Sequence, residues 1–415
     1  MNREFSDSVA FLGGIFSPRI YDEVIVNSKG SIQNAADALQ KLFIKGLAGE
    51  CKEFSVINLP YLGSFPKLYK KLYSPKAEET MAFGNTQTKV HTIRYFDFAL
   101  IKQYFIYRAA LKALRKWAKH NEKKERTVVI YALFTPFLKA AVKLKKEFED
   151  VRIIQIVPDL PEFMSDKNSW VLRMLKSKSN RMLNKLEVHI DGYVLLSRFM
   201  TERLPIDKQP VTIIEGISNI SRNQILESEG PDERYILYTG TLARRYGILN
   251  LVKAFTKVKD NNIKLIICGL GDAECEIREY AAKDSRIIFK GQILREKAIE
   301  LQQKATLLVN PRTPEGEFTK YSFPSKTMEY LASGTPTLMY RLPGIPDDYF
   351  QYFFSPEDES IDSLTAKMEE ILAMNPAKLR EFGQRGQNFV ANEKNPHVQA
   401  NKIVELIELI KKNKQ

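Results

Sequence analysis

Short apolar segments alternate with amphipathic ones along the whole chain. The apolar segments, such as Val9–Leu12 and Ile153–Val157, are continuous and rich in Val and Ile, which is typical of strands buried on both faces of a sheet. The segments between them, such as Ser31–Leu47, repeat apolar residues every three or four positions and therefore predict helices. Strands that alternate with helices predict an α/β fold with parallel sheets.

The alternation occurs in two series. The first contains the predicted strands 9–12, 54–59, 128–133, 153–157 and 193–196. The second contains strands 235–238, 263–268, 287–289 and 306–309, with helices 248–258, 274–283 and 296–303 between them. Because each series is long enough for one hydrophobic core, we predict two domains, 1–205 and 206–390, and a terminal helical segment, 391–415.

Three stretches depart from the alternation. Residues 61–94 carry few regular signals, so we expect a long irregular excursion there. Residues 204–232 are expected to link the two domains and to contain one short strand, 211–214. Residues 377–412 predict a helix with acids and lysines on its exposed side.

Composition narrows the class of protein. Apolar residues make up 44% of the 415 positions and charged residues 27%, which suits a globular protein. No apolar run approaches the ~20 residues that span a bilayer, and the run 9–16 lacks a signal-peptide cleavage pattern. The three cysteines are scattered, which predicts neither a disulfide framework nor structural zinc. We therefore expect a cytoplasmic protein.

The formal net charge of +13 indicates an anionic partner, unless the cations only solvate helices. Nucleic acid, anionic lipid and phosphorylated substrates would all qualify. No helix-turn-helix, zinc-finger or RNA-binding motif is present, so no nucleic-acid partner is expected.

Residues 305–336 carry the clearest chemical signal. The apolar run Ala305–Val309 predicts a buried strand that ends at Asn310-Pro311-Arg312. A helix is then expected to open near Pro324, because proline is tolerated in a first turn. The free N–H groups and positive dipole of such a helix end favour phosphate. Glu329 lies one turn further on, where a carboxylate could bind a ribose diol.

The segment Phe323-Pro324-Ser325-Lys326-Thr327-Met328-Glu329-Tyr330-Leu331, with Gly334-Thr335-Pro336 after it, resembles bacterial family 4 glycosyltransferases. These are retaining enzymes of the GT-B fold, in which two Rossmann-like domains with parallel sheets face a central cleft and a terminal helix often crosses back to the first domain. The family signature is Glu-x7-Glu. Glu329 matches the second glutamate, but Tyr321 stands in place of the first, and Glu315 and Glu317 are out of register. The Phe-Pro-Ser-Lys branch is common among polysaccharide-assembly enzymes.

The resemblance implies a nucleotide-sugar donor, with a UDP-sugar favoured, and no cofactor. The family's usual arginine and lysine in the first glycine loop are replaced by Thr241 and Tyr246, so Arg244 and Arg245 are expected to supply the charge. A plain tight turn is the alternative for the glycines, and an exposed helix edge for Glu329. The expected donor-binding residues are Gly240, Thr241, Arg244, Arg245, Gly269, Gly291, Ile293, Ser322, Phe323, Pro324, Ser325, Lys326 and Glu329.

Catalysis in this family depends mainly on positive charge at the leaving diphosphate, so Arg245 and Lys326 are the expected catalytic cations. Asp159 follows a strand and could orient or deprotonate an acceptor hydroxyl, or it could cap the next turn. No Asp-x-Asp stands at a strand end and the histidines lack ligand spacing, so no metal is expected. The predicted acceptor-binding residues are Gly13, Gly14, Asp159 and Glu162.

Two basic segments suit an anionic membrane surface. Residues 101–126 hold nine Lys/Arg with interleaved aromatic residues, and residues 170–187 are similar. The alternative for each is a core-facing helix with a solvated basic face. Both lie in the predicted acceptor domain, which favours a lipid-linked acceptor and peripheral association with the inner face of the cell membrane.

The leading hypothesis is a metal-independent hexosyltransferase that extends a lipid-linked saccharide during surface or exopolysaccharide assembly. A nucleotide-sugar epimerase with the same fold is one alternative. A non-catalytic scaffold is another, because the first signature glutamate and the usual Arg/Lys pair are missing. The sugar, the linkage and the oligomeric state are not indicated by the sequence.

Overall fold

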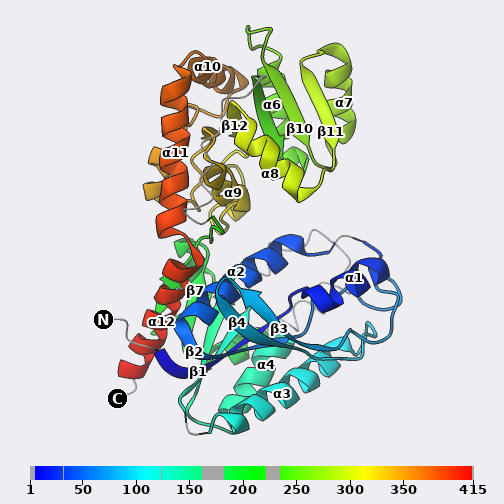
Figure 1. The fold of residues 1–415 in the computed structure, drawn as a ribbon, viewed down its shortest axis with the longest axis vertical. Helices are drawn as coiled ribbons and strands as arrows, with labels where there is room; N and C mark the ends of the chain where they lie inside the picture. The colour runs from blue at the N-terminus through cyan, green and yellow to red at the C-terminus, as the bar shows by residue number, and fades with distance from the viewer. Residues whose placement is uncertain (1–4, 31, 123, 161–181, 221–233, 414–415) are drawn as a thin grey trace. The chain divides into compact units, whose positions relative to one another are not determined.

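The computed structural model describes residues 5–30, 32–122, 124–160, 182–220 and 234–413. The chain forms two compact units, residues 1–217 with 396–415 and residues 218–395 (Figure 1). Each unit is built on one sheet covered by helices, and every pair of described strands except β3 with β4 is parallel. The predicted α/β class with two Rossmann-like domains is therefore confirmed.

The first unit holds an eight-stranded sheet in the order β3-β4-β2-β1-β5-β6-β7-β8. Its strands are β1 (Phe5–Gly13), β2 (Cys51–Asn58), β3 (Ala77–Phe83), β4 (Thr86–Thr92), β5 (Arg126–Tyr131), β6 (Val151–Val157), β7 (Gly192–Leu195) and β8 (Val211–Ile213). The chain leaves β1 on one side to form β2 and β4, and returns to β5 on the other side. The strand order therefore reverses at β1, between β2 and β5.

The expectation of an irregular excursion over 61–94 was wrong in its second half, where β3 and β4 form an antiparallel hairpin. Gly84 has a φ of +65° in the turn between them, a conformation that favours glycine. The hairpin gives little sequence signal because β3 is an edge strand and alternates half-buried with exposed polar residues.

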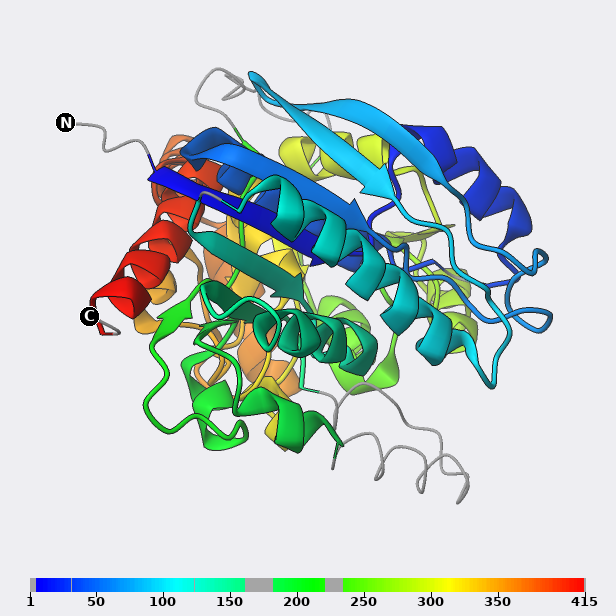
Figure 2. The same ribbon diagram turned by 90° about the horizontal axis from the view of Figure 1, so that it is seen from below.

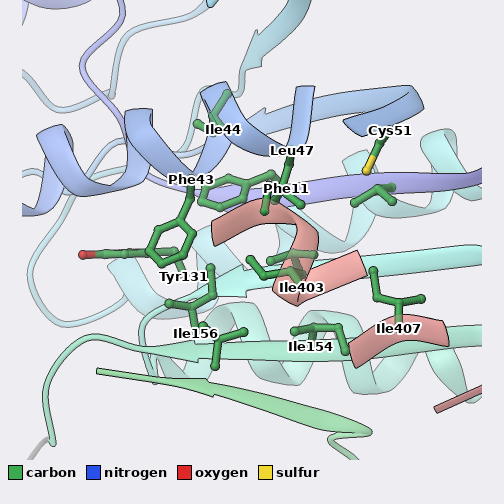
Figure 3. Packing of buried hydrophobic residues seen from close by; sticks show 14 of the residues in the cluster. Phe11, Phe43, Ile44, Leu47, Cys51, Tyr131, Ile154, Ile156, Ile403 and Ile407 are labelled. Atoms are coloured by element: carbon green, nitrogen blue, oxygen red, sulfur yellow. The ribbon is translucent and has the colours of Figure 1, made fainter. Parts of the chain in front are cut away.

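Helices cover both faces of this sheet. α2 (Asn34–Glu50) and α12 (Pro396–Lys412) pack together on one face, and α3 (Lys102–His120) and α4 (Thr135–Lys145) lie side by side on the other (Figures 1 and 2). The short α1 (Pro18–Asn27) follows β1. Ile403 and Ile407 of α12 join Phe43 of α2 and strand residues in one buried cluster (Figure 3). The C-terminal helix is thus part of the first unit's core.

The single helix predicted over 377–412 is interrupted: α11 (Pro376–Glu393) belongs to the second unit and α12 begins at Pro396. Pro396 has no N–H to donate to the preceding turn, and its ring disfavours helical backbone at Asn395.

The second unit holds a five-stranded parallel sheet in the order β11-β10-β9-β12-β13. Its strands are β9 (Tyr235–Thr239), β10 (Lys264–Cys268), β11 (Ile287–Gly291), β12 (Leu307–Asn310) and β13 (Thr337–Met339). Its helices are α6 (Ile248–Phe255), α7 (Glu274–Lys283), α8 (Arg295–Lys304), α9 (Ser325–Ser333), α10 (Ile361–Leu372) and α11. The strand order reverses at β9, between β10 and β12, as it does at β1 in the first unit.

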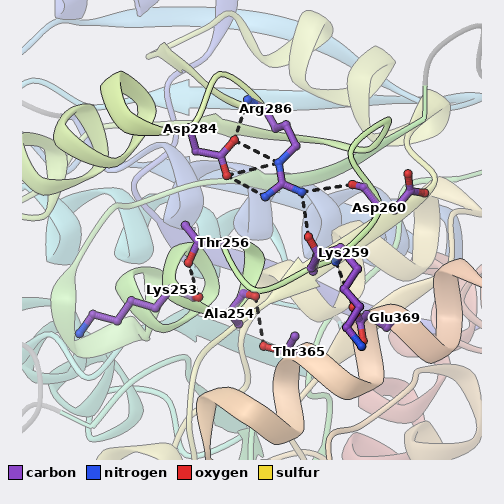
Figure 4. Close-up of polar contacts among 10 residues, drawn as sticks. Lys253, Ala254, Thr256, Lys259, Asp260, Asp284, Arg286, Thr365 and Glu369 are labelled. Carbon is purple, nitrogen blue, oxygen red and sulfur yellow. Dashed lines mark hydrogen bonds and ion pairs between the residues drawn. The ribbon is translucent and has the colours of Figure 1, made fainter.

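Polar contacts tie α6, α10 and the start of β11 together at the end of this sheet remote from the carboxyl ends of its strands (Figure 4). The Arg286 guanidinium donates to the Asp284 carboxylate and to the carbonyl oxygens of Val258 and Asp260. Its hydrogen bonds to Asp284 hold the pKa of that carboxyl below its usual value. Thr365 of α10 donates to the carbonyl oxygen of Ala254 at 3.1 Å.

Gly46 sets the distance between α2 and α12. A Cβ at this position would overlap the carbonyl oxygen of Pro396 and lie 2.8 Å from the Cβ of Ala400. Gly49, one turn later in the same helix, has nothing within 4 Å of where its Cβ would lie. Trp117 is buried in α3 of the first unit, and residues 218–395 contain no tryptophan, so tryptophan fluorescence follows the unfolding of the first unit.

We expect Gly46→Ala to lower the free energy of unfolding of the first unit by about 1–3 kcal/mol, because α12 must shift to accept the methyl group. Gly49→Ala is the matched control and should raise it by about 0.5–1 kcal/mol, because alanine is the better helix former. Urea denaturation followed by tryptophan fluorescence measures both. Equal effects of the two substitutions would show that α12 is not packed closely on α2.

Candidate functional site

Glycines stand where β9 and β10 end in the second unit. Gly240 follows β9 with a φ of +140°, and Gly269 follows β10 with a φ of +143°. A Cβ at Gly269 would overlap the carbonyl oxygen of Gly240, and one at Gly240 would overlap the end of the Lys326 side chain. These positions therefore require glycine, which lets two backbone segments and one lysine meet closely at the carboxyl edge of the sheet.

Lys326 brings a cation to this point. It lies in the first turn of α9 with its Nζ 5.3 Å from the centre of the Tyr238 ring. Burial lowers the pKa of Lys326, and the nearby Arg312 charge lowers it further, whereas Glu329 opposes the shift. The charged amine is poorly compensated here, so a bound anion would stabilise it.

The N-terminus of α9 adds positive potential from the same side. Pro324 is the residue before the helix, no side chain caps its first turn, and that turn contains no acid. The unpaired N–H groups and the dipole of this helix end favour an anion, as the sequence predicted.

Glu329 is held in a defined position one turn further along α9. Its Oε1 accepts a hydrogen bond from the side-chain amide of Gln302 in α8, which also donates to Thr239 Oγ1 at 2.8 Å. Gln302 is 1% exposed, and its carbonyl oxygen accepts from Thr335 Oγ1 at 2.6 Å. The other carboxylate oxygen of Glu329 takes no part in this contact with Gln302.

Arg312, which the sequence-based site omitted, lies at the carboxyl end of β12. Its guanidinium is 4.7 Å from the centre of the Phe318 ring and 5.5 Å from that of Tyr246. It also donates to Ser322 Oγ at 3.0 Å. The positive charge of Arg312 contributes to the lowered pKa of Lys326. The only sequence signal for Arg312 is its position directly after a buried strand.

The arginines of the glycine loop differ from each other. Arg244 is turned toward α7, where its guanidinium forms an ion pair with Glu276. Its backbone N–H donates to Asp272, just before that helix, at 2.8 Å. Arg245 lies over the Tyr246 ring, 5.1 Å from its centre. The sequence assigned the displaced charge to Arg244 and Arg245, with Arg245 favoured. The structure pairs Arg244 with Glu276 and places a further arginine, Arg312, after β12, the strand next to β9.

Several of the remaining residues that the sequence assigned to the donor take part in hydrogen bonds through their backbone atoms. Thr241 accepts from the Tyr238 hydroxyl through its carbonyl oxygen, and that of Gly291 accepts from the N–H of Gly269 at 2.8 Å. The Phe323 side chain is buried in a cluster with Tyr349, and Ile293 packs against another cluster. The sequence assigned these residues to a ligand, whereas the structure gives the side chains of Phe323 and Ile293 packing roles.

In the first unit, other parts of the protein pack closely against the loop after β1. A Cβ at Gly13 would overlap the Gln40 amide, and one at Gly14 would lie 2.6 Å from the carbonyl oxygen of Leu59. The space predicted to receive an acceptor at these glycines is thus filled by packing. Asp159 is exposed beyond β6, and its charge adds to the effect of burial in raising the pKa of Tyr131. Glu162 lies outside the described residues.

The backbone N–H groups of this loop are also used. Those of Gly14, Ile15 and Phe16 donate to the side chains of Gln40, Asn58 and Asp37, at 2.8, 2.7 and 2.7 Å. Because one acceptor is a carboxylate, this loop does not favour phosphate. Among the residues the structure describes, no group of three His, Cys, Asp or Glu side chains could hold a metal ion, and no helix is long and apolar enough to span a membrane.

The comparisons with known proteins agree with this geometry. Residues 221–389, most of the second unit, match the family model described as "Glycosyl transferases group 1". Among solved structures, sucrose-phosphate synthase from Thermosynechococcus elongatus superimposes with a TM-score of 0.63 at 16% identity, over 98% of this chain and 100% of that one. No curated protein matches the chain by sequence.

Two further structures align over nearly the whole chain. Anabaena Alr3699/HepE, solved with UDP and glucose, gives a TM-score of 0.60 at 12% identity over 97% of this chain and 100% of that chain. The lipopolysaccharide outer core galactosyltransferase WaaB gives 0.59 at 13% identity over 97% and 99%. The fold is therefore that of the GT-B glycosyltransferases. Within this class, residues 221–389 are the part that matches the group 1 family.

Lys326→Met should raise the free energy of unfolding of the unliganded protein by about 1 kcal/mol at neutral pH, because a poorly compensated charge is replaced by an apolar chain of similar length. The pKa of Lys326 in the folded protein lies below its ordinary value of 10.5, so the unfolded state binds more protons between these two values. The advantage of methionine should therefore be complete below the lowered pKa and disappear as the pH rises through 10.5.

Differential scanning calorimetry across the alkaline range measures this effect. Lys378→Met on α11, which replaces an exposed lysine, is the matched control and should change little. Destabilisation by Lys326→Met at neutral pH would contradict the view that this charge is held for a ligand.

Proposed function

We propose that this protein transfers a hexosyl group from a nucleotide sugar, with a UDP-sugar favoured, to a saccharide acceptor. The observation that supports this most directly is the convergence of Lys326, Arg312 and the uncapped start of α9 at the strand-order reversal beside β9. In open α/β sheets, ligands bind at such a reversal, outside the carboxyl ends of the strands. A diphosphate carries the charge that this arrangement lacks.

The family match and the structural neighbours support the same donor class. The matched residues 221–389 include Gly240, Arg312, Lys326 and Glu329. Anabaena Alr3699/HepE was also solved with UDP-glucose, and a mutant of S. aureus TarM with fondaparinux, alpha-GlcNAc-glycerol and UDP. We therefore extend the nucleotide-sugar donor to this chain, and favour UDP over other nucleotides.

The roles of the residues follow from the charges. Lys326 and Arg312 neutralise the diphosphate and stabilise the negative charge that develops on it as the glycosidic bond breaks. Glu329 accepts hydrogen bonds from the two ribose hydroxyls, with Gln302 holding its carboxylate in position. Gly240 and Gly269 allow the phosphates to approach the backbone. Arg245 remains a further candidate for the diphosphate.

The acceptor side of the reaction is assigned to the first unit. Asp159 is exposed at the carboxyl edge of that sheet, where it could orient an acceptor hydroxyl. We further propose a retaining, metal-independent reaction of the family 4 type on a lipid-linked saccharide, in surface or exopolysaccharide assembly at the inner face of the cell membrane. These finer assignments rest on the resemblance of the Phe323–Leu331 segment.

The alternatives predict different observations. A non-catalytic scaffold would bind no nucleotide or would bind it without turnover, whereas an epimerase would convert a nucleotide sugar without any acceptor. The half-buried, undercompensated Lys326 favours a diphosphate-binding protein over a scaffold, because such a charge persists at a cost in stability.

Calorimetric titration with UDP, GDP and ADP tests the donor site first. We expect the wild-type protein to bind one of these nucleotides, with UDP favoured, and Glu329→Ala to lower that affinity about tenfold or more through loss of charge-assisted hydrogen bonds to the ribose. Failure of all three nucleotides to bind would remove the proposed donor site and leave the scaffold.

A comparison of UDP with uridine distinguishes the proposed diphosphate role of Arg312 from the proposed ribose role of Glu329. Arg312→Gln should weaken UDP binding about tenfold, because a charge-assisted contact is lost, and leave uridine binding unchanged. Glu329→Gln should weaken both ligands. Arg385→Gln is the matched control, since Arg385 also stacks on an aromatic ring, Phe382, at 5.1 Å, but lies on α11. Equal weakening of UDP and uridine by Arg312→Gln would assign Arg312 to folding rather than to the diphosphate.

A further inference from the structure

The structure changes which part of segment 101–126 could meet a membrane. The apolar residues in the middle of α3, including Ile106, Leu114 and Trp117, are buried against the first unit. Along most of its length, α3 is therefore the core-facing helix that the sequence left as the alternative. The exposed apolar residues instead gather in the turn before the helix and in its first residues. Of the second segment, residues 170–181 lie outside the described residues.

We define the apolar turn as Phe98–Ile101. Leu100 is 88% exposed, and Phe98 and Ile101 are also exposed. Tyr104 and Phe105, at the start of α3, extend the same surface. Exposed apolar residues that occur singly are ordinary, but four consecutive apolar residues on one turn call for a partner.

A buried ion pair holds the apolar turn outward. Asp97 and Lys102 flank the turn, are 0% and 9% exposed, and form an ion pair of 2.7 Å. Lys102 Nζ also donates to the carbonyl oxygen of Leu62 at 2.6 Å. The N–H of Lys102 closes the turn on the carbonyl oxygen of Phe98 at 2.8 Å. With both ends fixed inside the protein, the apolar residues between them cannot fold back into the core.

Aromatic contacts join the turn to a neighbouring basic segment. Phe96 lies 5.2 Å from Phe105 and 5.4 Å from Tyr73, measured between ring centres. Phe98 forms a β-bridge with Phe65. Leu68 and Tyr73 are exposed, so they continue the apolar surface across this segment.

The charge around this surface has one sign over long stretches. Residues 59–77 contain four lysines and no Asp or Glu, although Lys71 pairs with Glu23. Residues 103–121, after the buried Lys102, contain five Lys/Arg and no Asp or Glu. Lys29 reaches the same segment and donates to the carbonyl oxygen of Pro66 at 2.9 Å. An apolar projection with aromatic residues and surrounding cations fits the interface of an anionic bilayer, where Tyr and Phe lie at headgroup depth.

We propose that the apolar turn, Phe98–Ile101, with Tyr104 and Phe105 inserts into the surface of an anionic membrane, and that the lysines of residues 59–77 bind its headgroups. The turn follows β4, and Asp159 follows β6, and both strands belong to the parallel part of one sheet. The turn and the proposed acceptor residue therefore lie on the same edge of the first unit. This inference rests on the proposed function for its purpose, which is to bring a lipid-linked acceptor to the enzyme.

Cosedimentation of the full-length protein with lipid vesicles tests this directly. We expect binding to vesicles of phosphatidylcholine with phosphatidylglycerol, weak binding to phosphatidylcholine alone, and a decrease as salt screens the headgroup charge. The double substitution Leu100→Gln with Ile101→Gln should lower the partition coefficient about tenfold or more, because two apolar side chains no longer leave water. Lys67→Gln with Lys70→Gln should remove the preference for phosphatidylglycerol.

Matched controls distinguish binding through this surface from non-specific binding of the protein to vesicles. Leu409→Gln replaces an exposed leucine on α12, and Lys378→Gln replaces an exposed lysine on α11, and neither should change vesicle binding. Vesicle binding that is absent, or that is unchanged in the Leu100/Ile101 variant, would overturn the inference. So would a dimer in sedimentation velocity that dissociates in this variant, since the turn would then bind a second copy.

Nucleotide titration of the same variants separates the two proposals. The Leu100/Ile101 variant should bind UDP as tightly as the wild type while losing the vesicles. If the wild type binds UDP but no vesicles, the proposed donor site is supported and the proposed membrane-binding surface is wrong. If it binds vesicles through the apolar turn but binds no nucleotide, the membrane-binding surface is supported and the proposed function is wrong.

Discussion

The parallel pairing of β9 with both β10 and β12 is the constraint on which the site of the second unit depends. The chain runs outward from β9 through β10 to β11 and then returns to β12 on the other side of β9. The loops after β9 and β12 therefore diverge from adjacent strand ends. Gly240 lies on one and Arg312 on the other, and α9 brings Lys326 over Gly240. Gly240 and the segment from Arg312 to Lys326, which are distant in sequence, meet because the strand order reverses here.

The two units use the same topology for different purposes. In the first unit, backbone N–H groups of the loop after β1 donate hydrogen bonds to the side chains of Gln40, Asn58 and Asp37. These bonds stabilise the loop and leave it unsuited to an anion. In the second unit, Lys326 lies over the glycine after β9 and no side chain caps the start of α9. The N–H groups after β1 are thus hydrogen-bonded within the protein, whereas the site after β9 carries a positive potential that a ligand can neutralise.

The charge of the chain likewise has more than one use. Ion pairs such as Arg126 with Asp150 and Lys145 with Asp191 use cations to support the first unit. Lys102 shows how a buried pair can serve geometry rather than stability, since it fixes the two ends of an exposed apolar turn. A net charge of +13 is therefore better understood through the position of each cation than through the sum.

Local sequence determined the α/β class, most strands and the start of α9, because hydrophobic period and proline position act over a few residues. It also indicated Lys326 and Glu329 within one helix. It missed the β3–β4 hairpin, in which the polar edge strand β3 pairs with β4 and β4 pairs with β2. It also missed Gln302 and Arg312, because the partners that give them a role come from other segments of the chain.

Tertiary structure alone decided which cations face the strand reversal. Arg244 and Arg245 are adjacent in sequence, yet Arg244 pairs with Glu276 of α7 and Arg245 lies on Tyr246. Likewise, the apolar residues of α3 resemble a membrane-binding face in sequence, but most of them pack inside the first unit. The sequence by itself determines which residues are apolar or charged, whereas the direction each side chain takes depends on neighbours that only the folded chain brings together.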